Sequence, residues 1–147
     1  MAALSVMPGP MSGKAIRISS EAHKTMIGHA EAAHPEEACG LLLGSEGAII
    51  EARPADNISR APETQFEIDP AALFSAMRAE RAGGPALLGY YHSHPSGAAE
   101  PSATDARRAL PDGKLWMVIA DGLAAGWISG EAGLHDRFRP ICLHIAD

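Results

Sequence analysis

Short apolar runs bounded by glycine or proline alternate along the chain with segments of helical pattern. Apolar runs of four to eight residues between such turn signals are typical of β-strands. Seven segments have this character: 14–18, 39–44, 47–53, 86–94, 114–120, 123–129 and a run around 134–145. Residues 66–68 add a brief eighth strand. Strands interleaved with helices predict an α/β fold with a mixed sheet flanked by helices.

Three helices are expected between these strands, over residues 20–33, 69–82 and 102–110. Ser19 or Ser20 offers an N-cap to the first helix, and Pro35 stops it. Asp69-Pro70 places an N-cap Asp before a Pro at the first position of the second helix. The remaining segments are predicted loops and turns: 54–62, 83–85, 95–102, Ser45-Glu46, Asp121-Gly122 and Gly130.

The length of 147 residues suits one domain, which we expect to cover residues 13–147 behind a flexible leader at 1–12. The leader lacks the basic start and continuous apolar stretch of a signal peptide. No run approaches the roughly 18 apolar residues that cross a bilayer, so no membrane partner is expected.

Charge and cysteine content exclude further classes. The net charge is −6 and no Lys/Arg cluster is present, which argues against a nucleic-acid partner. Cys39 and Cys142 are too few for a disulfide framework and favour a reducing cytoplasm.

The candidate chemistry lies in His92-Ser93-His94 and in Asp105. Side chains on a strand repeat every two residues, so His92 and His94 project from one face. Asp105 follows one loop later, in the first turn of a helix. Two imidazoles and a carboxylate leave the fourth position of a tetrahedral Zn²⁺ for water, as in catalytic zinc sites. Zinc lowers the pKa of such a water toward about 7 and polarises a carbonyl, and a carboxylate base is then needed.

Two plainer interpretations stay open for these residues. A His-x-His pair on a strand can be two ordinary histidines. Ser102-Ala-Thr-Asp105 also fits a capping box, in which Asp105 serves the helix terminus. The capping and ligand roles of Asp105 are compatible.

The full pattern resembles the JAMM (MPN+) metalloprotease signature, in which H-x-H, ten residues and Asp form the metal site. Residues 95–104 are the ten between His94 and Asp105, Ser102 matches the Ser of the signature, and Glu37-Ala-Cys39-Gly40 matches its upstream E-x-C-G sequence. The resemblance covers most of the chain and implies a cytidine-deaminase-like three-layer sandwich. It implies that His92, His94 and Asp105 hold one Zn²⁺, that Glu37 is the general acid/base, and that Ser102 donates to the tetrahedral intermediate.

The resemblance also implies a substrate. Members of the family hydrolyse peptide or isopeptide bonds after the C-terminal tail of ubiquitin-like proteins, which commonly ends in Gly-Gly and can lie along a sheet edge. The chain is most similar to short bacterial members, whose proposed substrates are ubiquitin-like sulfur-carrier proteins. The alternatives are a non-catalytic MPN-type binding module and a phage-tail or cell-wall peptidase.

Other residues are assigned away from the site. Glu36 should be a solvated charge, because neighbouring strand residues face opposite sides. Cys39 is interpreted as core packing. His29-Ala-Glu31-Ala-Ala-His34 lacks the i, i+4 spacing of a zinc helix, so both histidines are placed outside the site. A zinc deaminase would need C-x-x-C, and a serine hydrolase G-x-S-x-G; neither occurs.

Overall fold

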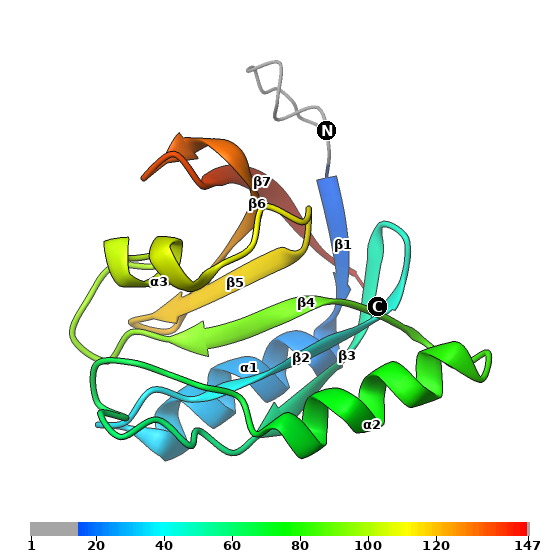
Figure 1. The fold of residues 1–147 in the computed structure, drawn as a ribbon, viewed down its shortest axis with the longest axis horizontal. Coiled ribbons are helices and arrows are strands. Elements are labelled where there is room, and N and C mark those ends of the chain that lie inside the picture. The colour runs from blue at the N-terminus through cyan, green and yellow to red at the C-terminus, as the bar shows by residue number, and fades with distance from the viewer. Residues whose placement is uncertain (1–14, 147) are drawn as a thin grey trace.

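The computed structural model describes residues 15–146 (Figure 1). In chain order the elements are β1 (Ala15–Ser19), α1 (Ser20–Ala33), β2 (Cys39–Ser45), β3 (Ala48–Ala55), α2 (Pro70–Arg81), β4 (Ala86–Ser93), α3 (Ala103–Arg108), β5 (Leu115–Ala120), β6 (Leu123–Leu134) and β7 (Phe138–Ala146). The expected leader at 1–12 lies outside the described residues, and the expected domain of 13–147 stays a prediction.

The strands form one mixed sheet in the order β1-β3-β2-β4-β5-β6-β7. The pairs β1–β3, β1–β7 and β4–β5 are parallel, and the other neighbours are antiparallel. Because β1 pairs with β7 as well as with β3, the sheet closes into a barrel. The α/β fold with a mixed sheet is confirmed. The sheet is a closed barrel where a three-layer sandwich was expected, since local patterns do not reveal which strands the first and last segments pair with.

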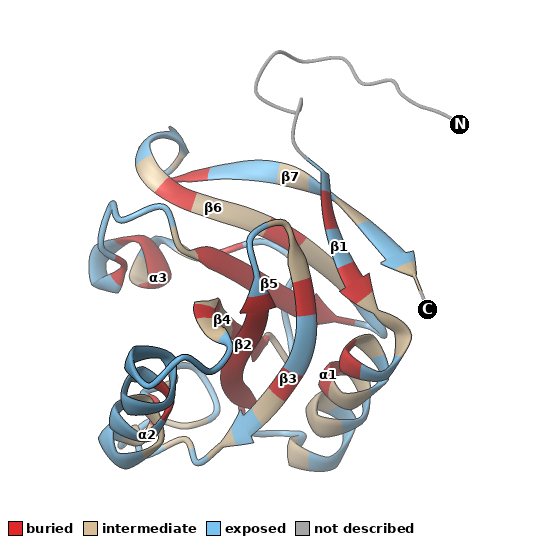
Figure 2. Ribbon diagram, turned by 90° about the vertical axis from the view of Figure 1, so that its right-hand side faces the viewer, coloured by how far each residue is buried: buried red, intermediate tan, exposed pale blue. Residues whose placement is uncertain are grey.

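The helices cover the two faces of the sheet around β2 and β4. Met26 of α1 packs with Leu42 and Tyr91 in the main apolar cluster. Leu41 and Leu43 point the other way, into a second cluster that contains Ala76 of α2. A third cluster joins α3 to β5 and β7 through Trp116 and Phe138. Strands β2 and β5 are therefore buried along nearly their whole length (Figure 2).

Capping side chains begin the helices where the sequence predicts. The Ala22 amide donates to Ser19 Oγ at 3.1 Å, which caps α1. The Ala71 amide donates to Asp69 Oδ1 at 3.0 Å, and Pro70 fills the first position of α2. Each cap satisfies an amide that has no partner within the helix.

Some bounds differ from expectation, and β3 runs on to Ala55, into the predicted loop at 54–62. Strand β6 continues through Gly130 to Leu134, and the chain reverses at His135 and Asp136, which have positive φ. The predicted turn at Gly130 was wrong, because its amide donates to Arg137 O at 2.7 Å and keeps β6 beside the returning chain. The predicted strand at 66–68 is a single bridge between Asn57 and Ile68.

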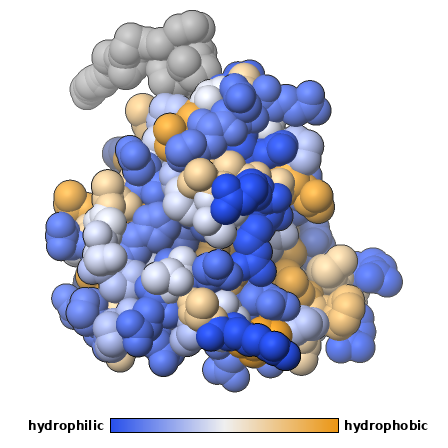
Figure 3. Space-filling model, turned by 60° about the vertical axis from the view of Figure 1, so that its left-hand side comes forward, coloured by the Kyte–Doolittle hydropathy of each residue, from blue (hydrophilic) through white to orange (hydrophobic). Residues whose placement is uncertain are grey.

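The surface is polar over the face shown in Figure 3, where apolar side chains occur in small separate groups. Within residues 15–146, no helix has the length and apolar character needed to cross a membrane.

Candidate metal centre

His92 and His94 lie at the C-terminal end of β4. The His92 side chain is fully buried, and its residue pairs with Cys39 of β2 and Val118 of β5. His94 follows the last residue of β4, but its amide still donates to Ile119 O at 2.8 Å, so the strand pattern continues. The two rings therefore project from one face, as the two-residue period predicts.

Three side-chain atoms from these residues and Asp105 form a tight triangle. His92 Nε2 lies 3.0 Å from His94 Nε2 and 3.0 Å from Asp105 Oδ2. His94 Nε2 lies 3.2 Å from the same oxygen. A tetrahedral Zn²⁺ with ligands at about 2.0–2.1 Å keeps those ligands about 3.3 Å apart. The donor set and its spacing therefore fit one zinc ion.

The helix cap orients the carboxylate of this triangle. Ser102 N donates to Asp105 Oδ2 at 2.9 Å, and Asp105 N donates to Ser102 Oγ at 3.0 Å, which completes a capping box at α3. The capping interpretation is thus confirmed, and the same bonds direct Oδ2 toward the two rings. Burial alone would raise the pKa of Asp105, but contacts with His92, His94 and the Ser102 amide hold it well below its usual value.

The imidazoles are also fixed from outside the triangle. His94 Nδ1 lies 3.1 Å from Ala98 O, and a proton on Nδ1 in that bond leaves Nε2 free as a ligand. The ring of His92 stacks on Phe66, with 4.3 Å between centroids and 20° between planes. Burial lowers the pKa of His92, which favours the neutral ring that binds metal.

Glu37 brings a second carboxylate to the two histidines. It is 5 % exposed, and Oε1 is buried without a hydrogen-bond partner among the described residues. Glu37, His92 and His94 offer ligand atoms within 4.8 Å of one another. Burial raises the pKa of Glu37 to about 7; the Asp105 charge adds to this effect and His94 opposes it.

The backbone that carries Glu37 is held by groups that sequence reasoning missed. Glu37 lies in the irregular segment between α1 and β2, not on a strand, and its amide donates to Pro62 O at 2.7 Å. Asn57 Nδ2 donates to Glu37 O and to Gln65 O, each at 3.0 Å. An Asn that closes a polar loop gives no sequence signal of this role, because its partners are backbone carbonyls.

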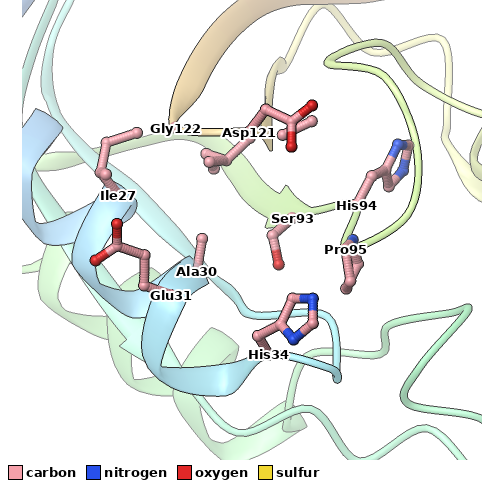
Figure 4. A pocket seen from close by; sticks show the side chains of 11 residues that line it. Ile27, Ala30, Glu31, His34, Ser93, His94, Pro95, Asp121 and Gly122 are labelled. Atoms are coloured by element: carbon pink, nitrogen blue, oxygen red, sulfur yellow. The ribbon is translucent and has the colours of Figure 1, made fainter.

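Two hollows adjoin the triangle, one lined by His94 and the other by Asp105. The first, here called the α1 pocket, has a volume of about 480 Å³ and is formed by α1, the end of β4 and the turn after β5 (Figure 4). Its lining includes Glu31, His34, Ser93, His94, Pro95 and Asp121. The second, the α3 pocket, has a volume of about 330 Å³ and includes Phe66, Leu73, Tyr90, Asp105, Arg108 and Trp116.

The residues assigned away from the site lie largely as expected. Cys39 is fully buried, and burial followed by the Glu37 and Asp56 charges raises the pKa of its thiol to about 12. Glu36 is exposed. His29 Nδ1 lies 2.7 Å from Tyr91 Oη, away from the metal triangle. His34 was placed outside the site, yet it lines the α1 pocket beside His94.

A family match identifies the domain. Residues 19–139 match the family described as prokaryotic homologs of the JAB domain. The chain belongs to this family. The match spans α1, Glu37, the triangle and most of the sheet, so it includes the residues of the metal triangle and of both pockets. Its members include JAMM-type metallopeptidases, and the chain is one of these enzymes.

Relatives of this JAB domain are known in archaea and bacteria. A desampylase from Haloferax volcanii is 28% identical over 92% of this chain and 99% of the relative. A CysO-cysteine peptidase from Mycobacterium tuberculosis is 35% identical over 69% of this chain and 70% of the relative. The solution structure of protein DSY2949 from Desulfitobacterium hafniense superimposes with a TM-score of 0.74 at 27% identity, covering 89% of this chain and 94% of that protein.

Proposed function

We propose that this JAB domain is a Zn²⁺-dependent peptidase or isopeptidase that cleaves the bond after the C-terminal glycine of a ubiquitin-like protein, such as a bacterial sulfur carrier. The observation that carries the proposal is the triangle of His92, His94 and Asp105 beside the buried, unpartnered carboxylate of Glu37. The names of the desampylase and the CysO-cysteine peptidase support the substrate class.

The two carboxylates differ in a way that separates their roles. Asp105 Oδ2 lies 3.0–3.2 Å from both ring nitrogens, and the low pKa of Asp105 keeps it ionised, as a metal ligand must be. Glu37 has no such bonds, and a pKa of about 7 suits a group that accepts and returns a proton near neutral pH. Asp105 is therefore the third ligand in the proposal, and Glu37 is the general acid/base.

The reaction divides among the residues of the chain. His92, His94 and Asp105 would hold the Zn²⁺, which when bound would activate a water molecule and polarise the scissile carbonyl. Glu37 Oε1 takes the proton from the attacking water and delivers it to the departing nitrogen. Ser102 Oγ accepts a hydrogen bond from the Asp105 amide, which leaves the hydroxyl hydrogen free to donate to the developing oxyanion.

The pairing of the strands next to the metal triangle limits how the C-terminal tail of the substrate can bind. Within residues 15–146, β2 and β4, the strands next to the metal triangle, each pair with a strand on both sides, so neither offers the free edge that strand addition uses. The α3 pocket instead offers Phe66, Tyr90 and Trp116 next to Asp105. We assign the residues before the terminal glycine to this pocket.

Metal analysis and a cleavage assay test the proposal together. The purified protein should hold one Zn²⁺ per chain and release a C-terminal extension from a Gly-Gly-ended sulfur carrier. The Glu37→Gln variant should retain the zinc and lose turnover. A zinc-loaded protein that binds the carrier without cleaving it would support the binding-module alternative.

A further inference from the structure

The α1 pocket carries a charge pattern that the proposed reaction does not explain. Figure 4 shows Glu31 of α1 and Asp121 after β5 around a hollow that His94 and Pro95 border. Among the eleven described residues that line this pocket, two are carboxylates and none is Lys or Arg. Within residues 15–146, neither carboxylate makes a hydrogen bond or ion pair with the protein. Both are therefore free to interact with a ligand.

The carboxylates around the α3 pocket are already engaged. Glu67 Oε1 lies 3.9 Å from Arg108 Nη2. Asp112 Oδ1 accepts a hydrogen bond from Ser129 Oγ at 2.9 Å. Asp105 belongs to the metal triangle. Among the described residues, the two pockets therefore differ in whether their carboxylates have protein partners: those of the α3 pocket do, and Glu31 and Asp121 of the α1 pocket do not.

Hydrolysis creates products of opposite charge. The oxygen of water bonds to the glycine carbonyl carbon, the C–N bond breaks, and the nitrogen takes up a proton. The acyl product leaves as a carboxylate and the amine product as an ammonium ion near neutral pH. Unpartnered carboxylates attract the amine product and repel the acyl product. The α1 pocket thus suits the amine side of the scissile bond, while the tail is assigned to the α3 pocket.

We propose that the α1 pocket selects the leaving group, and that the preferred leaving group is a lysine side chain in a basic protein segment. This inference rests on the proposed function. Lysine in an isopeptide bond brings no negative charge to the pocket, and neighbouring Lys or Arg residues meet Glu31 and Asp121. A single amino acid such as cysteine would carry a free α-carboxylate into the same space, where both anions repel it. The chain accordingly cleaves isopeptide bonds to protein lysines faster than it releases single amino acids.

The test compares leaving groups on one acyl part. A Gly-Gly-ended ubiquitin-like sulfur carrier is joined to the ε-amine of lysine in a peptide flanked by arginines, to the same lysine flanked by glutamates, or to free cysteine. The zinc-loaded protein should cleave the arginine-flanked conjugate fastest, by about five- to twentyfold over the other two. Such a preference should shrink in high salt, because exposed charges are screened.

Matched variants assign the preference to the pocket. Glu31→Gln and Asp121→Asn should each lower the preference for the arginine-flanked conjugate about two- to fivefold, as expected for exposed charge pairs. The double variant should nearly abolish this preference. Glu46→Gln is the control, because it removes the same charge just beyond the far end of β2. That position lies about 20 Å from Cys39, the residue that pairs with His92, so the leaving-group preference should not change. Fluorescence binding of the free arginine-flanked lysine peptide should weaken in parallel, without any need for turnover.

The results of the cleavage assay distinguish a failure of the leaving-group assignment from a failure of the proposed peptidase function. Equal cleavage of all three conjugates, faster release of cysteine, or an unchanged preference in the double variant would overturn the leaving-group assignment while leaving the peptidase intact. Failure to cleave any conjugate would overturn the proposed function and this inference with it.

Discussion

Replacing Glu37 by Gln should remove activity and stabilise the metal-free protein at the same time. The carboxylate is 5 % exposed and its Oε1 has no hydrogen-bond partner among the described residues. Loss of a general acid/base lowers the rate by about 10²–10⁴-fold. The variant keeps all three atoms of the triangle, so it should still bind zinc.

The stability change follows from the raised pKa. Burial moves the pKa of Glu37 from 4.5 to about 7, so the folded protein holds a proton that the unfolded chain releases between these values. Burial of this group therefore lowers the free energy of unfolding very little below pH 4.5, and lowers it by the full amount above about pH 7. That amount is about 3 kcal/mol at 1.36 kcal/mol for each pH unit between the two pKa values. The buried amide of the Glu37→Gln variant also has an unmet hydrogen bond, which lowers the stability of the variant by about 1 kcal/mol.

Denaturant unfolding of chelator-treated protein measures this difference. The Glu37→Gln variant should gain about 2 kcal/mol over the wild type at pH 8, and the gain should fall by about 2–3 kcal/mol at pH 5. Glu36→Gln is the matched control, since its exposed side chain should change neither activity nor stability. A Glu37→Gln variant that keeps a tenth of the activity, or a stability gain that is equal at both pH values, would refute the reasoning.

Three further outcomes are expected. Asp105→Asn removes the ligand charge and should lower zinc affinity by at least tenfold in a competition titration with a chromogenic chelator, whereas a helix-cap role alone would leave affinity unchanged. The thiol of Cys142 is exposed and should react with a thiol reagent at pH 8, while Cys39, with its pKa raised to about 12, should react only after unfolding; equal rates would contradict the buried assignment. Gly40→Ala should destabilise the fold by about 1–3 kcal/mol in denaturant titration, because an added Cβ would clash with the Tyr91 ring and with the Arg53 carbonyl; an unchanged midpoint would contradict this close approach.

Local sequence signals predicted the elements well. Ser19, Asp69 and Ser102 each begin a helix as N-caps, because capping depends on a few neighbouring atoms. Apolar runs located β2, β4 and β5, whose burial makes them nearly continuous in hydrophobicity. Gly130 misled the prediction, since a glycine can mark a turn or lie within a strand, and its partner on the returning chain decides which.

Features of the site that depend on distant partners could not be predicted in the same way. The spacing of His92, His94 and Asp105 predicted a common metal site, and the structure brings their atoms together. Strand alternation was used to argue that only one of Glu36 and Glu37 faces the metal, and the E-x-C-G register selected Glu37, but Glu37 lies in an irregular segment that Asn57 and the Pro62 carbonyl hold. Neither contact leaves a pattern in the sequence, because both involve backbone atoms.

The parallel pairing of β1 with β7 sets the order in which the chain can finish folding. Residues Ala15 to Ser19 find partners at Cys142 to Ala146, more than 120 positions later. During synthesis from the N-terminus, β1 can pair with β3 early, but its other side waits until β7 has left the ribosome. The hydrogen-bonding groups on that side stay open to other chains in the interval. Loss of the last few residues of β7 would prolong this exposure indefinitely, so small C-terminal truncations should cause aggregation even though they lie far from the metal triangle.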